Sequence, residues 1–208
     1  HTRYISVTGV QTCALPILID TVRDNLAKEN LTIRTKKARD WLRRNLKDLR
    51  VNQKALLSST DNKFARRIIP GKVYFYSYDP KLKQVLPYYD RFPLIIAIER
   101  YDDGFLGLNL HYLSTKQRMI LLNKLYDTLN NKKFDETTKM RINYNLLNNA
   151  RRYKEFEPCL KRYLYSHLKS RVMEIPSDDW EIALFLPTEQ FVKASATKVQ
   201  RDSIRSIK

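Results

Sequence analysis

The sequence predicts an α+β fold in which a small central antiparallel sheet or SH3-like barrel is flanked by basic helices. Three observations predict it: strand-like sequence is concentrated between Gly71 and Leu113, apolar residues on both sides recur at helical spacing, and the positive charge lies in those flanks. Within a formal net charge of +17, residues 18–71 and 114–208 each contribute +8, whereas residues 72–113 are neutral. The charge therefore belongs to the predicted helical regions.

The predicted β-unit covers residues 70–113. Val73–Tyr78 alternates aromatic and β-branched residues, which predicts a strand. Leu94–Ile98 is a continuous apolar run, typical of a strand buried on both faces. Tyr101–Gly104 predicts a hairpin loop in which the glycine supplies a positive φ, and Phe105–Leu113 predicts the closing strand. These patterns do not distinguish an open sheet from a barrel.

A basic helical region with a linker is predicted for residues 18–69. Leu18, Val22 and Leu26 follow a helical i, i+4, i+8 series, which predicts an amphipathic helix over 18–30. A second helix is predicted within Thr35–Arg50, with Thr35 as its N-cap. Residues 52–69 are polar and weakly patterned, and we predict a basic linker there.

The region from 114 to 193 is predicted to be helical and to pack on the β-unit. Ser114–Gln117 has the S-x-x-Q pattern of a capping box, which predicts a helix over about 115–130. Asp135 is suited to cap a second helix that carries Met140, Tyr144 and Leu147 on one face.

The last part of the chain predicts shorter elements. Ser177 is the expected N-cap of a helix that begins near Trp180 and stops at Pro187. Thr188–Lys193 is predicted to add a further turn. Residues 194–208 are basic and lack apolar periodicity, so we predict a mobile tail.

Two basic segments, Thr35–Arg50 and Ala150–Arg171, are the candidates for binding a polyanion. The first surrounds a Trp/Leu stripe with cations, and the second interleaves cations with aromatic residues, a combination that suits phosphate contact and base stacking. A solvated cationic face over a packed apolar stripe is the alternative for both. The candidate DNA-binding residues are Lys36, Lys37, Arg39, Arg43, Arg44, Lys47, Arg151, Arg152, Lys154, Lys161, Arg162, Lys169 and Arg171.

Tyrosines are frequent in the β-unit, and two roles are open for them. They either form a stacking surface for bases or, more commonly, fill a sheet core or a protein interface. The set comprises Tyr74, Tyr76, Tyr78, Tyr88 and Tyr89.

No catalytic, metal or cofactor site is predicted. His111 and His167 lack partners at metal-ligand spacing, so each is expected to be a hydrogen-bonded structural histidine. Asp90 with Glu99 approximates the acid set of a metal-dependent nuclease, but Tyr101 occupies the position of the required lysine. A turn carboxylate and a strand-end charge are the simpler interpretation.

Cys159 and the hydropathy exclude further classes. The basic surroundings of Cys159 favour a lowered pKa, but no base partner is identifiable, so a nucleophilic role is not predicted. No stretch approaches the roughly 20 apolar residues of a membrane span, and no membrane association is predicted.

The first 17 residues, HTRYISVTGVQTCALPI, resemble a translated sequencing adapter of the kind that occurs at the ends of unrelated metagenomic reading frames. We interpret residues 1–17 as a non-native segment and expect the natural start to lie upstream of Leu18, outside this sequence. Because Arg3 is the only lysine, arginine or acid in the segment, its exclusion lowers the net charge from +17 to +16.

Several sequence words resemble one viral family. They are GKVYFYSYDPK at 71–81, LPYYDRFPL at 86–94, GFLGLNLHYL at 104–113, PCLKRYL at 158–164, HLKSR at 167–171 and WEIALFLPTEQF at 180–191. They are similar to words in the DNA end protector family of T-even-like myoviruses, over roughly residues 40–205. Another head, neck or tail completion family of these viruses is the competing assignment.

The resemblance implies a noncatalytic virion protein, present in the host cytoplasm during assembly. Such a protein would bind the ends of packaged double-stranded DNA, shield them from host exonuclease and help complete the head. Its implied partners are DNA ends and phage head or portal/neck proteins. There are two alternatives. One is a structural connector that meets acidic capsid or portal surfaces without binding DNA, and the other is a nuclease that uses Asp90 and Glu99.

Overall fold

The computed structural model describes residues 14–58, 63–129 and 154–205, with isolated positions between 130 and 153. The α-helices in these ranges are α1 (Leu15–Lys28), α2 (Lys36–Leu46), α3 (Gln53–Ser58), α4 (Thr115–Leu129), α6 (Trp180–Phe185) and α7 (Ala196–Arg205). The strands are β1 (Val73–Phe75), β2 (Tyr89–Asp90), β3 (Leu94–Arg100), β4 (Gly104–Asn109), β5 (Leu160–Leu164), β6 (Met173–Ile175) and β7 (Phe191–Val192). Short 3₁₀ turns are η2 (Leu110–Tyr112), η3 (Lys154–Cys159), η4 (Tyr165–His167) and η5 (Ser177–Asp179).

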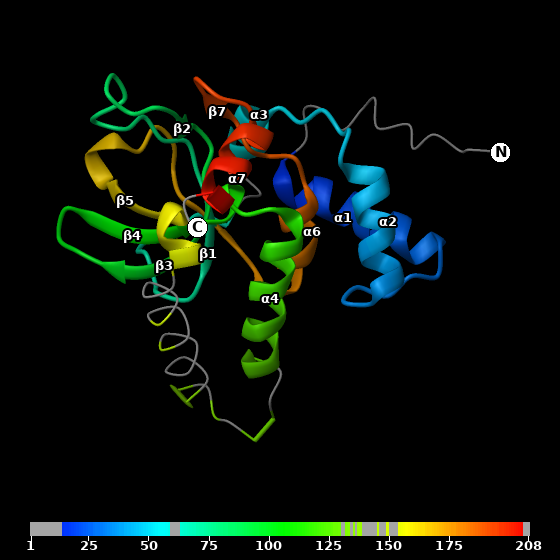
Figure 1. The fold of residues 1–208 in the computed structure, drawn as a ribbon. Coiled ribbons are helices and arrows are strands. Elements are labelled where there is room, and N and C mark those ends of the chain that lie inside the picture. Colours follow the sequence, from blue (N-terminus) through cyan, green and yellow to red (C-terminus); the bar gives the residue numbers. More distant parts are fainter. Residues whose placement is uncertain are drawn as a thin grey trace.

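The predicted α+β class is confirmed, and the central element is an open antiparallel sheet rather than a barrel. Its strand order is β5-β4-β3-β1-β6, and β2 pairs separately with β7. Strands β5 and β6 come from the region predicted to be helical, so the sheet is not confined to residues 70–113 (Figure 1). The β-unit supplies the centre of the sheet and the later segment supplies both edges.

One face of the sheet is covered by helices. Alternate residues of β1 and β3, including Val73, Phe75, Leu94 and Ile96, are buried in one cluster with apolar residues of α1, α2, α4 and α6. Helix α6 lies between the sheet and the α1–α2 pair and also contacts α4 (Figure 1). Since successive side chains of a strand point to opposite faces, this set leaves the intervening residues on the other face.

The opposite face is aromatic and is covered by loops. Tyr74 and Tyr76 pack there with Phe105 and Tyr163, under the segments around Ile68 and Leu168. Tyr76 makes edge contacts to Phe105 and Tyr163, with ring centroids 5.8 and 5.5 Å apart. Burial raises the pKa of the Tyr76 hydroxyl well above its ordinary value. For Tyr74, Tyr76 and Tyr78, all buried, the core interpretation is confirmed.

The first predicted strand is shorter than expected. Strand β1 ends at Phe75, and Tyr76–Tyr78 leave the ladder with β3. Backbone hydrogen bonds redirect this stretch, because Ser77 O accepts from Lys169 N at 2.8 Å and Tyr78 N donates to Arg91 O at 2.9 Å. The alternation of aromatic residues continues through Tyr78, but the backbone hydrogen-bond partners of Ser77 and Tyr78 lie in two distant segments.

Strands β3 and β4 form the predicted hairpin, yet the role of Gly104 differs from the prediction. Tyr101 N donates to Gly104 O at 2.8 Å, which closes the loop. Among the glycines of the described residues, Gly71 alone has a positive φ, so Gly104 does not supply one. Instead, a Cβ at Gly104 would lie 2.0 Å from the carbonyl oxygen of Tyr163 in β5. The glycine is needed for the close approach of two strands.

Gly104→Ala is expected to lower the free energy of unfolding by about 2–3 kcal/mol, because β5 must move away from β4. Gly107→Ala is the matched control in the same strand, since its Cβ would meet Ile95 Cδ1, the end of a flexible side chain, at 2.6 Å. Urea unfolding of both variants measures the difference. Equal losses for the two would contradict this role of Gly104.

The N-terminal helices are confirmed, and the linker is not featureless. Helix α1 buries Leu18, Val22 and Leu26, as the spacing predicts. It also buries Ala14 and Leu15 at its start, so the fold uses these residues while the foreign origin of segment 1–17 stays a prediction. The predicted linker contains α3, which buries Leu56 and Leu57. Two adjacent leucines, Leu56 and Leu57, are too short an apolar pattern to predict a helix from the sequence.

The capping box before α4 is confirmed. Ser114 N donates to the Gln117 side chain at 3.0 Å, and Gln117 N donates to Ser114 Oγ at 3.4 Å. Asp135 accepts from Thr138 N at 2.8 Å, the bond expected of an N-cap. Met140, Tyr144 and Leu147 lie outside the described residues.

Three predictions for residues 177–208 are wrong. Ser177 does not cap a helix: it opens the turn η5, and α6 starts at Trp180 without a side-chain cap. Residues 188–193 extend into β7, which pairs with β2, rather than adding a helical turn. The predicted tail forms α7 between Ala196 and Arg205, in which Val199 and Ser203 are buried. Two buried positions four residues apart were too weak a periodicity to detect. Pro187 does stop α6, as predicted.

Candidate nucleic-acid interface

Helix α2 forms as predicted and presents a cationic face. Thr35 Oγ1 accepts from Ala38 N at 3.2 Å, which is the expected N-cap bond, and Trp41 and Leu42 are buried. Five predicted contact residues on this helix and its C-cap are exposed, namely Lys36, Lys37, Arg43, Arg44 and Lys47.

Arg39 has a structural partner instead. Its guanidinium donates to the carboxylate of Glu181 in α6, which is 0% exposed, and to Asn123 Oδ1 in α4 at 2.8 Å. Glu181 also accepts from Arg34 N at 2.5 Å. Because a buried carboxylate requires a charged partner, the Arg39 side chain is committed to holding α2 on α6. We therefore leave Arg39 out of the interface.

The segment Ala150–Arg171 is a series of short elements rather than one basic helix. The order is η3, β5 and η4, with Pro158 inside η3. Arg151 and Arg152 lie outside the described residues, as does the side chain of Lys154. Arg162 projects from β5, pairs with Asp103 and lies 3.7 Å above the Tyr101 ring. The backbone of β5 pairs with β4, which explains why the helical expectation failed.

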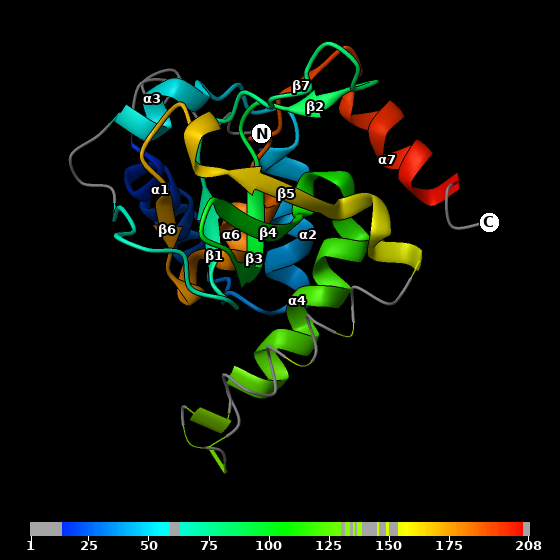
Figure 2. The ribbon, with the colours of Figure 1, turned by 90° about the vertical axis from the view of Figure 1, so that its left-hand side faces the viewer.

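The two predicted basic groups lie on opposite sides of the molecule. Figure 1 shows α2 at one side and β5 at the other, with α6 and the sheet between them, and Figure 2 places β5 in front and α2 behind. In the described part of the chain, α2 and β5 therefore do not form one common surface.

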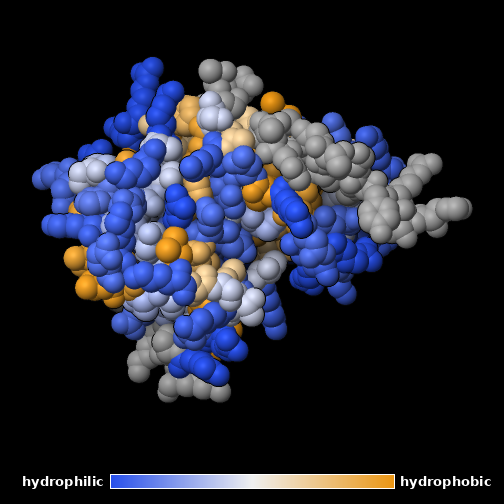
Figure 3. Space-filling view, turned by 90° about the horizontal axis from the view of Figure 1, so that it is seen from above, coloured by the Kyte–Doolittle hydropathy of each residue, from blue (hydrophilic) through white to orange (hydrophobic). Residues whose placement is uncertain are grey.

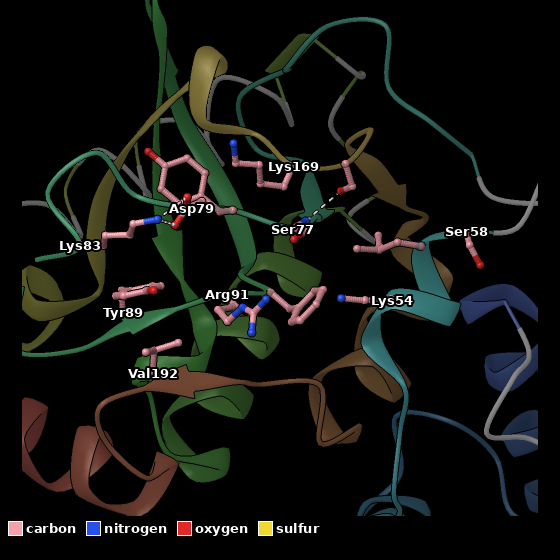
Figure 4. A pocket seen from close by; sticks show the side chains of 13 residues that line it. Lys54, Ser58, Ser77, Asp79, Lys83, Tyr89, Arg91, Lys169 and Val192 are labelled. Carbon is pink, nitrogen blue, oxygen red and sulfur yellow. Dashed lines mark hydrogen bonds and ion pairs between the residues drawn. The ribbon is translucent and has the colours of Figure 1, made fainter.

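A cavity of about 730 Å³ gathers cations from four separate segments. Figure 4 shows Lys54 from α3, Lys83 from the loop after β1, Arg91 after β2 and Lys169 after η4 around its walls. Asp79 accepts from Lys83 Nζ at 2.8 Å, and this hydrogen bond lowers the pKa of the aspartate. Seen from above in Figure 3, this side of the molecule is largely hydrophilic, with small apolar patches.

A second cavity of about 520 Å³ adjoins the first and is lined by four arginines. Ser170 lines both cavities, and its Oγ accepts from Ser77 N at 2.8 Å. The guanidinium of Arg171 lies 3.9 Å from the centre of the Phe64 ring, which restrains it. The four arginines are Arg66, Arg67, Arg100 and Arg171.

We call the two neighbouring cavities together the basic groove. Its cationic lining residues are Lys54, Lys83, Arg91, Lys169, Arg66, Arg67, Arg100 and Arg171. Two carboxylates, Asp79 and Asp102, accompany these eight cations. Within the described ranges, Lys83 is the one cation of the eight with a carboxylate ion pair. A concave surface with this charge excess attracts polyanions.

Sequence reasoning placed Lys169 and Arg171 of this groove and missed the other six as contacts. No local pattern marks them, because they come together through pairings of distant segments. Phe64 bridges to Met173, and Tyr78 bridges to Leu168, which brings the predicted linker and the η4 region to one place.

Asp90 is buried in a hydrogen-bond network of the fold. Its Oδ2 lies 2.6 Å from His111 Nδ1 and accepts from Asn109 Nδ2 at 3.2 Å, while Oδ1 accepts from Phe92 N at 3.1 Å. His111 Nε2 completes the network with Thr188 Oγ1 at 3.1 Å. All lone pairs of the buried carboxylate that face the protein have partners, and His111 is the hydrogen-bonded structural histidine that was predicted.

The remaining candidate groups also serve the fold. Glu99 accepts from the Tyr101 hydroxyl at 2.7 Å, and His167 Nδ1 lies 2.9 Å from Asp79 O. Burial raises the pKa of Cys159 to about 12, so the basic surroundings do not activate it. The described residues contain no group of three or more His, Cys, Asp or Glu side chains arranged to hold a metal ion. None of their helices is long and apolar enough to cross a membrane.

Comparison with known proteins identifies the family. A family model described as "Phage T4 terminal DNA protecting protein" matches residues 16–203. No curated protein and no solved structure matches the chain. Since the family match spans nearly the whole chain and includes both cavities of the basic groove, the chain belongs to the phage T4 terminal DNA protecting protein family.

Proposed function

We propose that the protein binds the ends of packaged double-stranded phage DNA without cleaving them, and that the basic groove holds the phosphate backbone near the end. The eight converging cations carry this proposal. Bound there, the protein would shield the DNA end from exonuclease within the virion.

Arginine is well suited to this task because its planar guanidinium binds phosphate oxygens in a bidentate manner. Four of the eight cations are arginines grouped in one cavity. The Phe64 ring under Arg171 keeps that guanidinium in place before DNA arrives. Preorganised donors lose less side-chain entropy on binding.

The exposed cations of α2 support a second contact. Helix α2 lies on the side of α6 away from β5 (Figures 1 and 2), and its cations are exposed, so we expect a duplex in the groove to leave them accessible. We assign Lys36, Lys37, Arg43, Arg44 and Lys47 to an acidic surface of a phage head or portal/neck protein. This contact would serve head completion after assembly in the host cytoplasm.

Replacing Arg66, Arg100 and Arg171 together with glutamine is expected to weaken DNA binding and to reduce the slope of log affinity against log salt by about 2–3. Each lost phosphate contact removes a slope of about 0.9, because fewer counterions are released. Fluorescence anisotropy with blunt-ended duplex, measured from 50 to 300 mM salt, gives the slope.

The matched control replaces Lys36, Lys37 and Arg44 with glutamine, which removes the same number of charges from α2. Its slope is expected to change by less than about 1. If the α2 variant reduced the salt slope more than the groove variant did, the DNA interface would lie on α2. Equal affinity of the wild type for linear and circular duplex would reject end binding, and no binding at low salt would reject the function altogether.

A further inference from the structure

A third cavity, of about 300 Å³, adjoins the basic groove and differs from it in chemistry. Tyr78 and Tyr89 line both this cavity and the first cavity of the groove, so the two cavities are neighbours that share these wall residues. We call it the tyrosine pocket, and its lining includes Tyr88, Tyr89, Tyr112, Leu82, Leu86 and Lys161.

The walls of the tyrosine pocket are fixed by aromatic packing. Tyr112 contacts Phe191 edge-on with ring centroids 5.2 Å apart, and Tyr88 lies 6.1 Å from Tyr112. Tyr78 and Tyr163 make an edge contact at 5.0 Å on the adjoining wall. A cavity built this way is preformed, and its ring faces suit a flat aromatic ligand.

The loop that covers the pocket is also held in place. Lys193 Nζ donates to the carbonyl oxygens of Lys83, Gln84 and Leu86, at 2.8, 3.1 and 3.0 Å. This loop nevertheless exposes Leu82 by 61% and Val85 by 76%. Apolar side chains at the mouth of an ordered pocket are typical of a binding site.

Lys161 is a hydrogen-bond donor in the wall of the pocket, which Lys81 and Arg162 also line. Its ammonium lies 4.5 Å from the centre of the Tyr112 ring, and burial lowers its pKa. In the described ranges, no carboxylate forms an ion pair with it. A ligand with lone pairs at the edge of an aromatic ring would satisfy this donor.

We propose that the tyrosine pocket receives the base of the terminal nucleotide while the basic groove holds the neighbouring phosphates, an inference that rests on the proposed function. A nucleobase has a π-face for the tyrosines and acceptor atoms for Lys161, and every base can stack, so the site tolerates any sequence. The position of the pocket beside the groove, with Tyr78 and Tyr89 shared between them, favours a nucleotide over an apolar protein side chain.

Such a pocket would select ends. A base inside a duplex enters only after its pair and both stacks are broken, whereas a base at an end has lost one stack already and an overhanging base is unpaired. Phosphate contacts alone bind linear and circular DNA equally well. The pocket would therefore supply the selectivity for DNA ends that phosphate contacts in the groove lack.

The experiment uses a hairpin duplex with one open end that carries a single-nucleotide overhang, either intact or abasic, on the 3′ or the 5′ strand. The wild type is expected to bind the intact overhang about tenfold more tightly than the abasic one on at least one strand. Tyr89→Leu and Lys161→Met are expected to weaken binding to the intact overhang and to remove most of that preference. The groove variant Arg66→Gln is expected to weaken both forms and keep the ratio.

Photocrosslinking provides a second readout that does not depend on the variants. A 5-iodouracil base at the overhang is expected to crosslink to Tyr88, Tyr89 or Tyr112, as mapped by mass spectrometry. A wild type that prefers ends over circles but binds intact and abasic overhangs equally would overturn the pocket and leave the proposed function standing. Crosslinks confined to other regions would also overturn it. A wild type that binds no DNA would overturn both.

Discussion

Asp90→Ala is expected to lower the free energy of unfolding by about 4 kcal/mol. The carboxylate is buried, and its removal leaves His111, Asn109 Nδ2 and the amides of Phe92 and Gln190 without their acceptor. Removing one member of a buried charged network leaves the other members desolvated, which is the costly step. Urea unfolding monitored by the fluorescence of the buried Trp41 and Trp180 measures the loss.

Two further variants separate this structural role from catalysis. Asp90→Asn keeps the shape and one acceptor oxygen, so its expected loss is smaller than that of Asp90→Ala. Glu99→Gln keeps an acceptor for the Tyr101 hydroxyl and is expected to change stability by less than about 0.5 kcal/mol. Magnesium-dependent DNA cleavage by the wild type that both Asp90→Asn and Glu99→Gln abolish, without loss of stability, would contradict this account and restore the nuclease hypothesis.

Arg39→Ala is expected to lower the free energy of unfolding by about 3–5 kcal/mol and to leave the DNA affinity of the folded protein within about twofold. The reason is Glu181, which is 0% exposed and would lose its charged partner. Thermal and urea unfolding measure the first effect, and anisotropy at a temperature where the variant is folded measures the second.

Arg43→Ala is the matched control on the same helix. Arg43 is 58% exposed and its contact with Asp40 is 3.7 Å, so its loss is expected to cost less than about 1 kcal/mol. The double variant Arg39→Met with Glu181→Leu is expected to recover most of the stability, because it removes both buried charges. If Arg39→Ala instead kept full stability and lost DNA binding, Arg39 would return to the interface.

The sequence predicted the elements whose signal is local. Helix α1 repeats an apolar residue every four positions, α4 begins with a capping box, and β3 is a run of five apolar residues. Each pattern is decided by neighbours within one or two turns, or by burial on both faces. Local chemistry therefore sufficed for these elements and for the α+β class.

Strand β5 shows why other elements were missed. Its residues LKRYL place Lys161 and Arg162 next to each other, and Tyr163 alone among the five is buried. The sequence therefore shows neither the two-residue period of a strand nor the 3.6-residue period of a helix. Pairing with β4, more than 50 positions earlier, decides its conformation. The same long-range dependence hid β6 and the pairing of β2 with β7.

The candidate site was less predictable than the fold. Charge indicated a polyanion partner, but the exposed α2 face and the Arg39 ion pair look alike in sequence, since both are basic residues on one amphipathic helix. The second cavity of the groove draws its arginines from residues 66–67, 100 and 171, and no local sequence pattern marks them. Their proximity depends on the sheet edge formed by β6.

The position of β6 also constrains how the chain folds. This strand pairs with β1, about 100 residues earlier, and α6, which follows it directly, supplies Glu181 to α2. During synthesis, the first helices and the central strands must therefore wait for residues 173–185 before their burial is complete. Contacts this distant along the chain slow folding, and a nascent chain stalled before that point would expose the leucines of α1 and α2 to chaperones.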